Sequence, residues 1–307
     1  MHIVVTGGAG FIGSHLVDAL LEGGEDTVLV VDNMRRGRMA NLAHHERDAR
    51  FRVLVGDIRD EGFVHSALRG ADLVYHLGAQ SNVLGALSDP RYSFESNVGG
   101  TFNVLEAARQ HGVRRVVFAS SREAYGETTR LPVDETQPLQ AKNLYGASKA
   151  AAEVYCRTFS TAFALPVAIL RLSNVYGLRD VDRVIPLWID RALKGEPLDV
   201  YGGRQLIDFV PVDTVVRALL VAGSADVATI PINVASGAGT SIHDLASRIL
   251  GLTQSRSFLR VQPARETEVV RFVADVTRME SLLGVKAPSD PLHHLHELVV
   301  STTGRGS

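Results

Sequence analysis

Tyr145 and Lys149 are the side chains in this sequence whose types and spacing best suit proton transfer. Residues four apart on a helix lie on one face, so the ammonium can lie near the phenol or share a ribose with it. A free phenol titrates near ~10, and nearby positive charge favours the phenolate, which then serves as a base around neutrality. Because Tyr-x-x-x-Lys is common by chance, its meaning depends on what precedes it.

What precedes it is a glycine-rich turn between a strand and a helix. Apolar residues 3–5 come directly before Gly7, Gly10 and Gly13, and the amphipathic run SHLVDALLEGG follows. The first glycine permits a tight turn, the second lets the backbone approach a pyrophosphate, and the third lets helix and strand pack closely. Free N–H groups at the helix N-terminus then meet the phosphates. The context predicts a dinucleotide cradle.

The next strand, residues 27–31, ends in Asp32. A carboxylate at that strand end can accept hydrogen bonds from the adenosine ribose, and it would repel the 2′-phosphate of NADP. Arg35, Arg36 and Arg38 follow closely and weaken the exclusion of NADP. NAD is the cofactor we expect.

Strands and helices alternate along the first half of the chain, which is typical of a parallel sheet covered on both faces. We expect strands at 51–55, 73–77, 115–119 and 167–172, and helices at 60–68, 92–111 and from about residue 144. The fold class is therefore α/β, a Rossmann-type doubly wound parallel sheet with a smaller C-terminal α/β substrate domain. Residues 1–173, with returning segments at about 208–234, should form the NAD-binding domain, and residues 174–207 and 235–307 the substrate domain.

The loops at the carboxyl ends of these strands should form one crevice. Asp57 and Ile58 suit the adenine amino group and the adenine face, and residues 76–80 should run beside the cofactor, with His76 a packed strand residue. The cofactor-binding residues we predict are Gly7, Gly10, Phe11, Ile12, Gly13, Asp32, Asn33, Asp57, Ile58, Leu77, Ala79, Tyr145 and Lys149.

Composition excludes several partners. The formal net charge of −2 over 307 residues gives no basic footprint for nucleic acid and no polybasic patch for a membrane surface. The first strand begins at residue 2 and no apolar run approaches the length of a bilayer span, so we expect a cytoplasmic protein. The single cysteine, Cys156, excludes an internal disulfide and lies in a helical pattern as a packing residue.

Five segments together resemble the extended short-chain dehydrogenase/reductases, specifically the nucleotide-sugar epimerases and dehydratases. They are TGGAGFIG at 6–13, GDI at 56–58, SSREAYG at 120–126, YGASK at 145–149 and RLSNVYG at 171–177. The resemblance implies a tightly held NAD that removes a hydride from a sugar carbon and later returns it. It also implies that Tyr145 is the base, that Lys149 binds the nicotinamide ribose and lowers the tyrosine pKa, and that Ser121 hydrogen-bonds the same sugar hydroxyl.

The substrate implied by the resemblance is a nucleotide-diphosphate sugar. Asn174 would contact the diphosphate, and Arg265 would grip it, a task that suits a bidentate guanidinium. The family usually has arginine immediately before Asp208, where this sequence has Ile207. An aliphatic side chain cannot make that ion pair, so the diphosphate either relies on Arg265 and Arg204 or is held differently.

Glu123 leaves the reaction open. Members that only epimerise at C4 usually have small or neutral residues after the catalytic serine, whereas 4,6-dehydratases have Asp-Glu or Ser-Glu and decarboxylases Ser-Glu; this chain has Arg122-Glu123. Glu123 could take the C5 proton during elimination, or it could be a structural carboxylate paired with Arg122. The leading interpretation is a nucleotide-hexose 4-epimerase similar to UDP-glucose 4-epimerase. The alternatives are a 4,6-dehydratase or decarboxylase using Glu123, and, more remotely, a non-catalytic NAD-sensing protein.

Two further expectations concern metal and assembly. His293, His294 and His296 form a histidine-rich segment without an acidic or thiol companion, and hydride shuttling needs no metal, so we predict no metal site. The helices at 92–111 and 144–163 have more apolar residues than one sheet face needs. By resemblance, they pair into a two-fold four-helix bundle and make a homodimer.

The glycine turn, Asp32 and a cofactor that is regenerated in each cycle predict that NAD stays bound during purification. Denaturing the pure protein and assaying the released nucleotide should yield NAD. Release of predominantly NADP would contradict the argument from Asp32.

Overall fold

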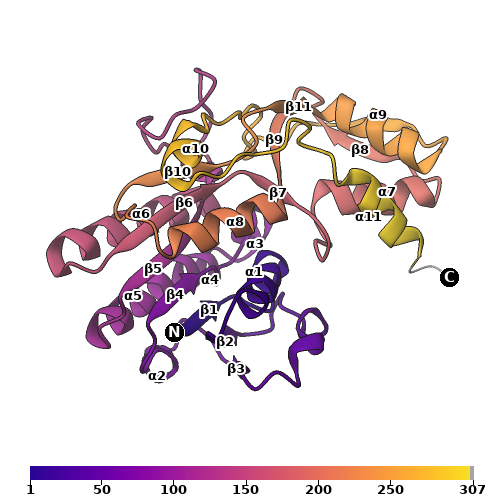
Figure 1. Cartoon of the computed structure of the whole chain (residues 1–307). Coiled ribbons are helices and arrows are strands. Elements are labelled where there is room, and N and C mark those ends of the chain that lie inside the picture. Colours follow the sequence, from indigo (N-terminus) through magenta and orange to yellow (C-terminus); the bar gives the residue numbers. More distant parts are fainter. Residues whose placement is uncertain (305–307) are drawn as a thin grey trace.

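The computed structural model describes residues 1–304 and has a seven-stranded parallel sheet at its centre (Figure 1). The strand order is β10-β6-β5-β4-β1-β2-β3, and every neighbouring pair is parallel. The strands are β1 (His2–Thr6), β2 (Thr27–Asp32), β3 (Phe51–Val55), β4 (Leu73–His76), β5 (Arg115–Ser121), β6 (Val167–Leu172) and β10 (Pro231–Val234). The predicted Rossmann-type α/β fold is confirmed.

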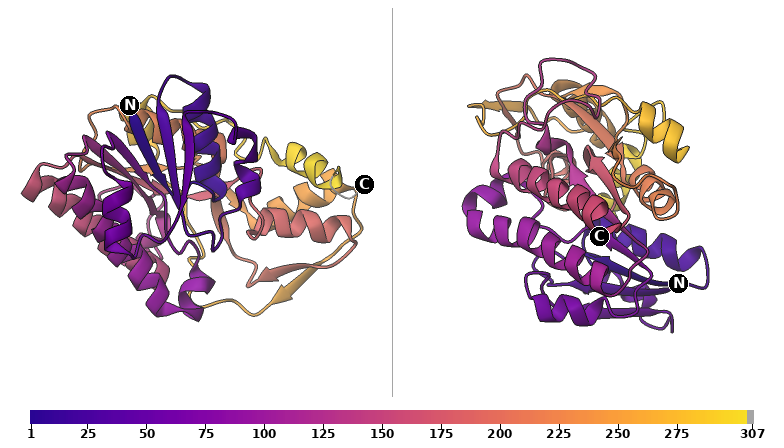
Figure 2. Two further views of the ribbon diagram at one scale, coloured as in Figure 1. Left: turned by 90° about the horizontal axis from the view of Figure 1, so that it is seen from below. Right: turned by 90° about the vertical axis from the view of Figure 1, so that its left-hand side faces the viewer.

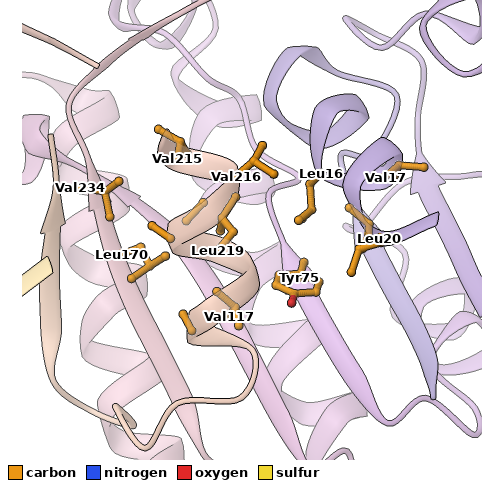
Figure 3. Packing of buried hydrophobic residues seen from close by; sticks show 14 of the residues in the cluster. Leu16, Val17, Leu20, Tyr75, Val117, Leu170, Val215, Val216, Leu219 and Val234 are labelled. Carbon is orange, nitrogen blue, oxygen red and sulfur yellow. The ribbon is translucent and has the colours of Figure 1, made fainter. Parts of the chain in front are cut away.

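Helices cover both faces of this sheet, as the views in Figure 2 show. On one face, α1 (Phe11–Glu22) and α8 (Val212–Ala222) pack side by side (Figure 3), with α1 over β1 and β2 and α8 over β6 and β10. Leu16 and Leu20 of α1 meet Val216 and Leu219 of α8 above Tyr75. On the other face lie α2 (Glu61–Ala67), α5 (Gly100–Gln110) and α6 (Leu144–Phe163). Burial on both faces explains why the strands are nearly continuous apolar runs.

The C-terminal part of the chain adds a smaller lobe with its own hydrophobic cluster. Its sheets have the orders β11-β9-β7 and β12-β8, flanked by α7, α9 and α11 (Figure 1). The elements are β7 (Asn174–Tyr176), α7 (Val184–Leu193), β8 (Leu198–Tyr201), β9 (Leu206–Pro211), β11 (Gly239–Ser241), α9 (Ile242–Thr253), β12 (Leu259–Gln262) and α11 (Leu295–Thr303). The chain enters this lobe after β6, returns to the central sheet for α8 and β10, and leaves again.

The helix predicted for residues 92–111 is wrong in its details. The segment begins earlier, as α4 (Pro90–Phe94), widens into the π-helical turn η3 (Glu95–Gly99), and continues as α5. A separate short helix, α3 (Val83–Ser88), precedes it and was not predicted. Asp89 ends α3 and caps α4 by accepting the N–H of Tyr92, and Pro90 then suits the first turn. The remaining helical pieces are η1 (Met39–Asn41), η2 (Ala43–His45), η4 (Arg122–Ala124) and α10 (Thr277–Leu283).

Residues 277–285, which the sequence placed with the substrate lobe, pack on the central sheet instead of the smaller lobe. Met279, Leu283 and Val285 belong to the same cluster as α1 and α8, and α10 contacts β10. The division into a cofactor and a substrate domain remains a prediction.

His76 and Cys156 are packed residues, as the sequence predicts. Cys156 is fully buried beneath the sheet, where its thiol has a strongly raised pKa because of desolvation. His76 is hydrogen-bonded on both ring nitrogens, to the hydroxyls of Thr6 (2.7 Å) and Thr101 (3.0 Å), which sequence reasoning missed. Burial lowers the pKa of His76 to about 3, so the ring is neutral and serves to hold β1 and α5 beside β4.

Candidate active site

The site forms where the N-terminus of α6 meets the end of β5. Asn143 is the N-cap of α6, since its side-chain oxygen accepts the N–H of Gly146 at 2.8 Å. A Cβ atom at Gly146 would lie 2.2 Å from the carbonyl oxygen of Glu123, so only glycine lets the helix approach the turn η4 this closely. This approach brings Tyr145 and Ser121 together.

The Tyr145 hydroxyl is hydrogen-bonded to Ser121, the last residue of β5. Desolvation by burial raises the pKa of Tyr145, while the hydrogen bond from Ser121 and the charges of Arg183 and Arg122 lower it. These residues alone therefore leave the phenol protonated at neutral pH. It can exchange a proton with a hydroxyl group that Ser121 also contacts.

Lys149 lies one turn further along α6 and is almost completely buried. Its ammonium donates to the carbonyl of Ala119 at 2.8 Å and lies 4.8 Å from the centre of the Phe118 ring. Burial lowers the pKa of Lys149 to about 8. The expected effect of Lys149 on the pKa of Tyr145 remains a prediction, because the cations that act on the phenol in this structure are Arg183 and Arg122.

Glu123 is held at both carboxylate oxygens. Arg122 contacts one oxygen at 2.8 Å and Asn143 donates to the other at 2.7 Å. The same guanidinium donates from Nε to the side-chain oxygen of Asn174 at 2.6 Å. The structure thus has the arrangement of a structural carboxylate paired with Arg122, one of the two alternatives left open by the sequence.

The glycine turn has the shape of a nucleotide cradle. Gly7 has a positive φ of 71°, and a Cβ atom on it would lie 2.8 Å from the backbone nitrogen of Gly78, just after β4. A Cβ atom at Gly13 would lie 2.2 Å from the carbonyl oxygen of Gly7, which shows how closely α1 begins against the turn. Leu77 and Ala79 flank Gly78, so the structure places them beside this turn. These features fit a dinucleotide with its pyrophosphate at the N-terminus of α1.

Asp32 ends β2 beside the turn and is nearly buried. Its oxygens accept the N–H groups of Ala9 at 3.1 Å and Met34 at 2.9 Å, and desolvation raises its pKa. Each oxygen retains a lone pair, so the carboxylate can still accept from a ribose hydroxyl. A Cβ atom at Gly37 would lie 2.6 Å from this carboxylate, so the loop after β2 closes tightly around it.

The residues predicted for adenine also gather. Asn33 donates to Asp57 at 2.9 Å and to the hydroxyl of Tyr92 at 3.1 Å, while Ile58 is buried next to them beneath Gly100. Tyr92 was not predicted, because it lies on the short helix α4 that the sequence pattern did not separate from α5.

The three arginines after Asp32 differ in their surroundings. Arg35 stacks on Tyr92 at 3.7 Å and lies 3.7 Å from Asp89, and Arg36 binds Asp182 at 2.6 Å. Arg38 is exposed, and its side chain has no partner among residues 1–304. Two of the three guanidinium groups are therefore already engaged with carboxylates, which favours NAD over NADP at this site.

Within residues 1–304, no hydrogen bond or ion pair joins the predicted diphosphate ligands to one another. Asn174 begins β7, and because its oxygen is occupied by Arg122, its NH₂ group is left to donate. Arg265 stacks on Tyr201 at 3.5 Å and binds Glu268 at 2.7 Å. Arg204 is exposed and has no side-chain partner within the described part of the chain. Ile207 packs against the hydrophobic cluster of the smaller lobe, which explains why an aliphatic residue is tolerated there.

Arg183 is the functional candidate that sequence reasoning missed most clearly. It precedes α7, binds Asp180 at 3.0 Å, lies 5.5 Å from the centre of the Phe11 ring, and lowers the pKa of Tyr145. Phe11 therefore lies at the contact between the glycine turn and the smaller lobe. Ile12, its neighbour, packs against the core shared by α1 and α8. No short-range pattern links residue 183 to residue 145, since only the folded chain brings them together.

The C-terminal histidines have acidic neighbours after all. His294 lies 3.1 Å from Glu297 and 3.6 Å from Asp213, so the expectation that the segment lacks an acidic companion was wrong. Elsewhere, Asp18 accepts from His44 and His45 at 2.8 Å each, and Arg179 binds its other oxygen at 2.8 Å. That carboxylate is fully engaged by protein donors.

No helix in residues 1–304 is long and apolar enough to cross a bilayer.

Comparison with known proteins identifies relatives over nearly the whole chain. Residues 3–235 match the model of the NAD-dependent epimerase/dehydratase family. A putative UDP-glucose 4-epimerase of Methanocaldococcus jannaschii is 37% identical over 287 residues, covering 91% of this chain and 92% of that protein. The UDP-glucose 4-epimerase of Thermotoga maritima, solved with UDP-glucose, has a TM-score of 0.94 and 31% identity, covering 100% of both chains. A dTDP-glucose 4,6-dehydratase of Streptomyces venezuelae, solved with NAD, has a TM-score of 0.95 and 32% identity, covering 100% of this chain and 98% of that one.

The geometry around Tyr145 predicts that Tyr145→Phe keeps the fold but loses turnover of a nucleotide sugar by at least roughly a hundredfold, the low end for a positioned acid–base group. The measurements are turnover and the melting temperature of the purified variant. Tyr155→Phe, an exposed tyrosine on the same helix, is the matched control and should remain active. Near-native turnover of Tyr145→Phe would remove this phenol from the mechanism.

Proposed function

The chain belongs to the NAD-dependent epimerase/dehydratase family, and we propose that it interconverts a nucleotide-diphosphate hexose and its C4 epimer through a transient 4-keto sugar. Three sets of features support the proposal: the cradle at the glycine turn, the Ser121–Tyr145 pair and the relatives named above. UDP-glucose is the substrate class to test first, because it appears in the names of relatives and neighbours.

In this proposal, the glycine turn and Asp32 hold NAD, with Asn33, Asp57 and Ile58 at the adenine. Bound NAD supplies a reversible hydride acceptor at C4 of the sugar. The side chains of the protein manage the proton. Tyr145, as a phenolate favoured by the neighbouring Lys149 ammonium, takes the proton from the C4 hydroxyl and returns it. Ser121 orients that hydroxyl, and Lys149 also binds the nicotinamide ribose.

The diphosphate would be bound by Asn174 and Arg265, with Arg204 as a further candidate. An amide NH₂ already oriented by Arg122 is suited to donate to a phosphate oxygen, because its geometry is fixed before the ligand arrives. Arg265 would exchange its contact with Glu268 for the more highly charged phosphate. Ile207 supplies no charge, so fewer ionic contacts hold the diphosphate than in members with arginine there.

The observation that favours epimerisation over elimination is the engagement of Glu123. Elimination needs a base for the C5 proton, and Glu123 is the carboxylate that the sequence offers. Because Arg122 and Asn143 hold its two oxygens and its side chain is buried, moving it onto the sugar would break an ion pair and a hydrogen bond. Epimerisation requires only that the 4-keto sugar rotate in the site before the hydride returns, so it needs no movement of Glu123. Dehydration or decarboxylation with Glu123 as base is the second candidate, and an NAD-sensing protein without activity a remote one.

A homodimer is the assembly we propose. The outer face of α4, α5 and α6 exposes large apolar side chains, and Phe102 packs edge-on against Tyr155 across α5 and α6 at 5.8 Å. The exposed members of this dimer face are Phe94, Phe102, Val154, Tyr155 and Phe163. An apolar patch of this kind is typical of a protein interface. A two-fold axis would join α5 and α6 to their copies as a four-helix bundle.

Two coarser expectations complete the proposal. We keep the assignment of residues 1–173 with about 208–234 to cofactor binding and of 174–207 with 235–307 to substrate binding, although residues 277–285 of the latter pack on the central sheet. We also keep a cytoplasmic location, because nucleotide sugars and NAD are metabolites of that compartment and the chain has one buried cysteine.

The reaction is tested by incubating the enzyme with a panel of nucleotide sugars and following the products by NMR and mass spectrometry. We expect an epimer of unchanged mass. Glu123→Gln should reduce turnover by much less than the roughly hundredfold loss that removal of a general base causes. Tyr145→Phe serves as the inactive reference. Loss of water or carbon dioxide from the substrate, with a large loss of rate in Glu123→Gln, would establish the eliminating alternative instead.

The dimer face predicts a dimer mass by light scattering at micromolar concentration. Phe102→Glu should give a monomer, because a buried unpaired carboxylate at the interface is costly. Phe258→Glu replaces another exposed phenylalanine, far along the chain from this face, and should remain dimeric. A monomeric wild-type protein would contradict the proposed assembly.

A further inference from the structure

Two buried charged side chains, Glu153 and Arg171, lie directly behind the candidate active site. Glu153 follows Lys149 by one turn on α6 and is completely buried, and Arg171 faces it from β6. The guanidinium contacts both carboxylate oxygens, at 2.8 Å from Nη2 and 3.0 Å from Nε. Ser120, the neighbour of Ser121 on β5, donates to the same carboxylate at 2.5 Å. The carboxylate is therefore held rigidly between the catalytic helix and the two strands beneath it.

Tyr145, Lys149 and Glu153 are spaced by four residues and so share one face of α6. Lys149 carries three N–H donors, yet the only acceptor its ammonium contacts among residues 1–304 is the carbonyl of Ala119. A buried ammonium with so few partners tends to lose its proton. The neighbouring groups therefore decide whether Lys149 is charged.

The titratable groups that face Lys149 come from three elements. On α6, negative charge on either Cys156 or Glu153 would raise the pKa of Lys149. The Cys156 thiol stays protonated because burial raises its pKa strongly, so Glu153 is the group of the two that carries the charge. From β4, His76 is neutral at physiological pH, since burial lowers its pKa to about 3. From β6, Arg171 is paired with Glu153. Glu153 is the only carboxylate in this set.

We propose that Glu153 is a positioning residue of the reaction, whose buried carboxylate keeps Lys149 in the ammonium form at neutral pH. The ammonium is the form that can bind ribose hydroxyls and lie beside a phenolate. Ser120 and Arg171 hold the carboxylate in place for this task. The inference rests on the proposed function in that it assigns Lys149 to the reaction, but the charge of Lys149 can be measured without turnover.

The pKa of Lys149 is about 8 in the structure, so removal of the nearby carboxylate should bring it towards neutrality. A neighbouring opposite charge shifts a pKa by roughly one to three units. We therefore expect the midpoint of the Lys149 titration to fall by about one pH unit or more in Glu153→Gln. The ammonium exists below this midpoint and is lost as the pH rises through it, so the alkaline limb of the pH–rate profile should move to lower pH by the same amount.

The sequence makes this measurement practical. It contains four lysines, Lys142, Lys149, Lys194 and Lys286, so protein labelled with ¹³Cε-lysine gives four side-chain signals. Arginine substitutions of the other three identify the signal of Lys149. The titration uses the protein as purified, in its assembled state.

Two further variants make the test independent of folding defects and of general effects of buried charge. Glu153→Gln with Arg171→Met removes both members of the pair, so no unpaired guanidinium is left, and the Lys149 midpoint should again fall. Glu135→Gln is the matched control, because Glu135 is a buried carboxylate that accepts the N–H of Asn233 at 2.8 Å, lies near Arg278, and is not among the groups that shift the pKa of Lys149. The Glu135→Gln variant should leave the midpoint of the Lys149 titration unchanged.

An unchanged Lys149 midpoint in the folded double variant would overturn the proposal. An equal fall in Glu135→Gln would also overturn it, because the effect would then not depend on Glu153. Absence of turnover with every nucleotide sugar would contradict the proposed function alone, since the titration would still report on Glu153.

Discussion

The site depends on how α6 docks on the end of β5. Three contacts at successive turns of the helix determine this docking: Gly146 against the carbonyl of Glu123, Lys149 on the carbonyl of Ala119, and Glu153 on the hydroxyl of Ser120. Because the contacts lie one turn apart on a single face, they determine both the rotation of the helix and its height above the sheet. With rotation and height determined, the phenol of Tyr145 can only lie at the mouth of the crevice beside Ser121.

This docking has an energetic cost that the surrounding polar groups offset. Taking a carboxylate and a guanidinium out of water costs several kcal/mol per ion, and their attraction compensates only when the remaining hydrogen-bonding groups are also satisfied. In this structure the remaining groups are satisfied, because Ser120 donates to Glu153, and Arg171 also donates to the hydroxyl of Tyr125 at 2.8 Å. Tyr125 in turn donates to Asn233 on β10 at 2.8 Å. The network therefore links α6 to strands β5, β6 and β10, and so reaches the edge of the sheet.

The sequence predicts most of the fold because its signals are local. Continuous apolar strands, the spacing of Gly7, Gly10 and Gly13, and the acid at the end of β2 are each contained in a short window, and the parallel sheet follows from their alternation. The features it missed depend on contacts between distant segments. Arg183 reaches Tyr145 only because the chain crosses from β6 into the smaller lobe, and Tyr92 joins Asn33 only because a proline and a π-helical turn reorient α4. The residue types at these positions have no distinguishing local pattern.

Arg122 shows why the choice of reaction could not be settled from residue types alone. In the sequence, Arg122 and Glu123 are a cation and a potential base side by side, and the residue types do not say which of them faces the sugar. In the folded chain, the guanidinium reaches both Glu123 and Asn174, so one residue occupies the potential base and orients an amide toward the region where we place the diphosphate. A carboxylate engaged in this way is poorly placed to remove a carbon-bound proton, whereas the Ser121–Tyr145 pair remains free to exchange a proton with a hydroxyl. The contact of Gly146 with Glu123 that helps to position the phenol also brings η4 and its ion pair next to it, which supports the proposed proton transfer at oxygen rather than at carbon.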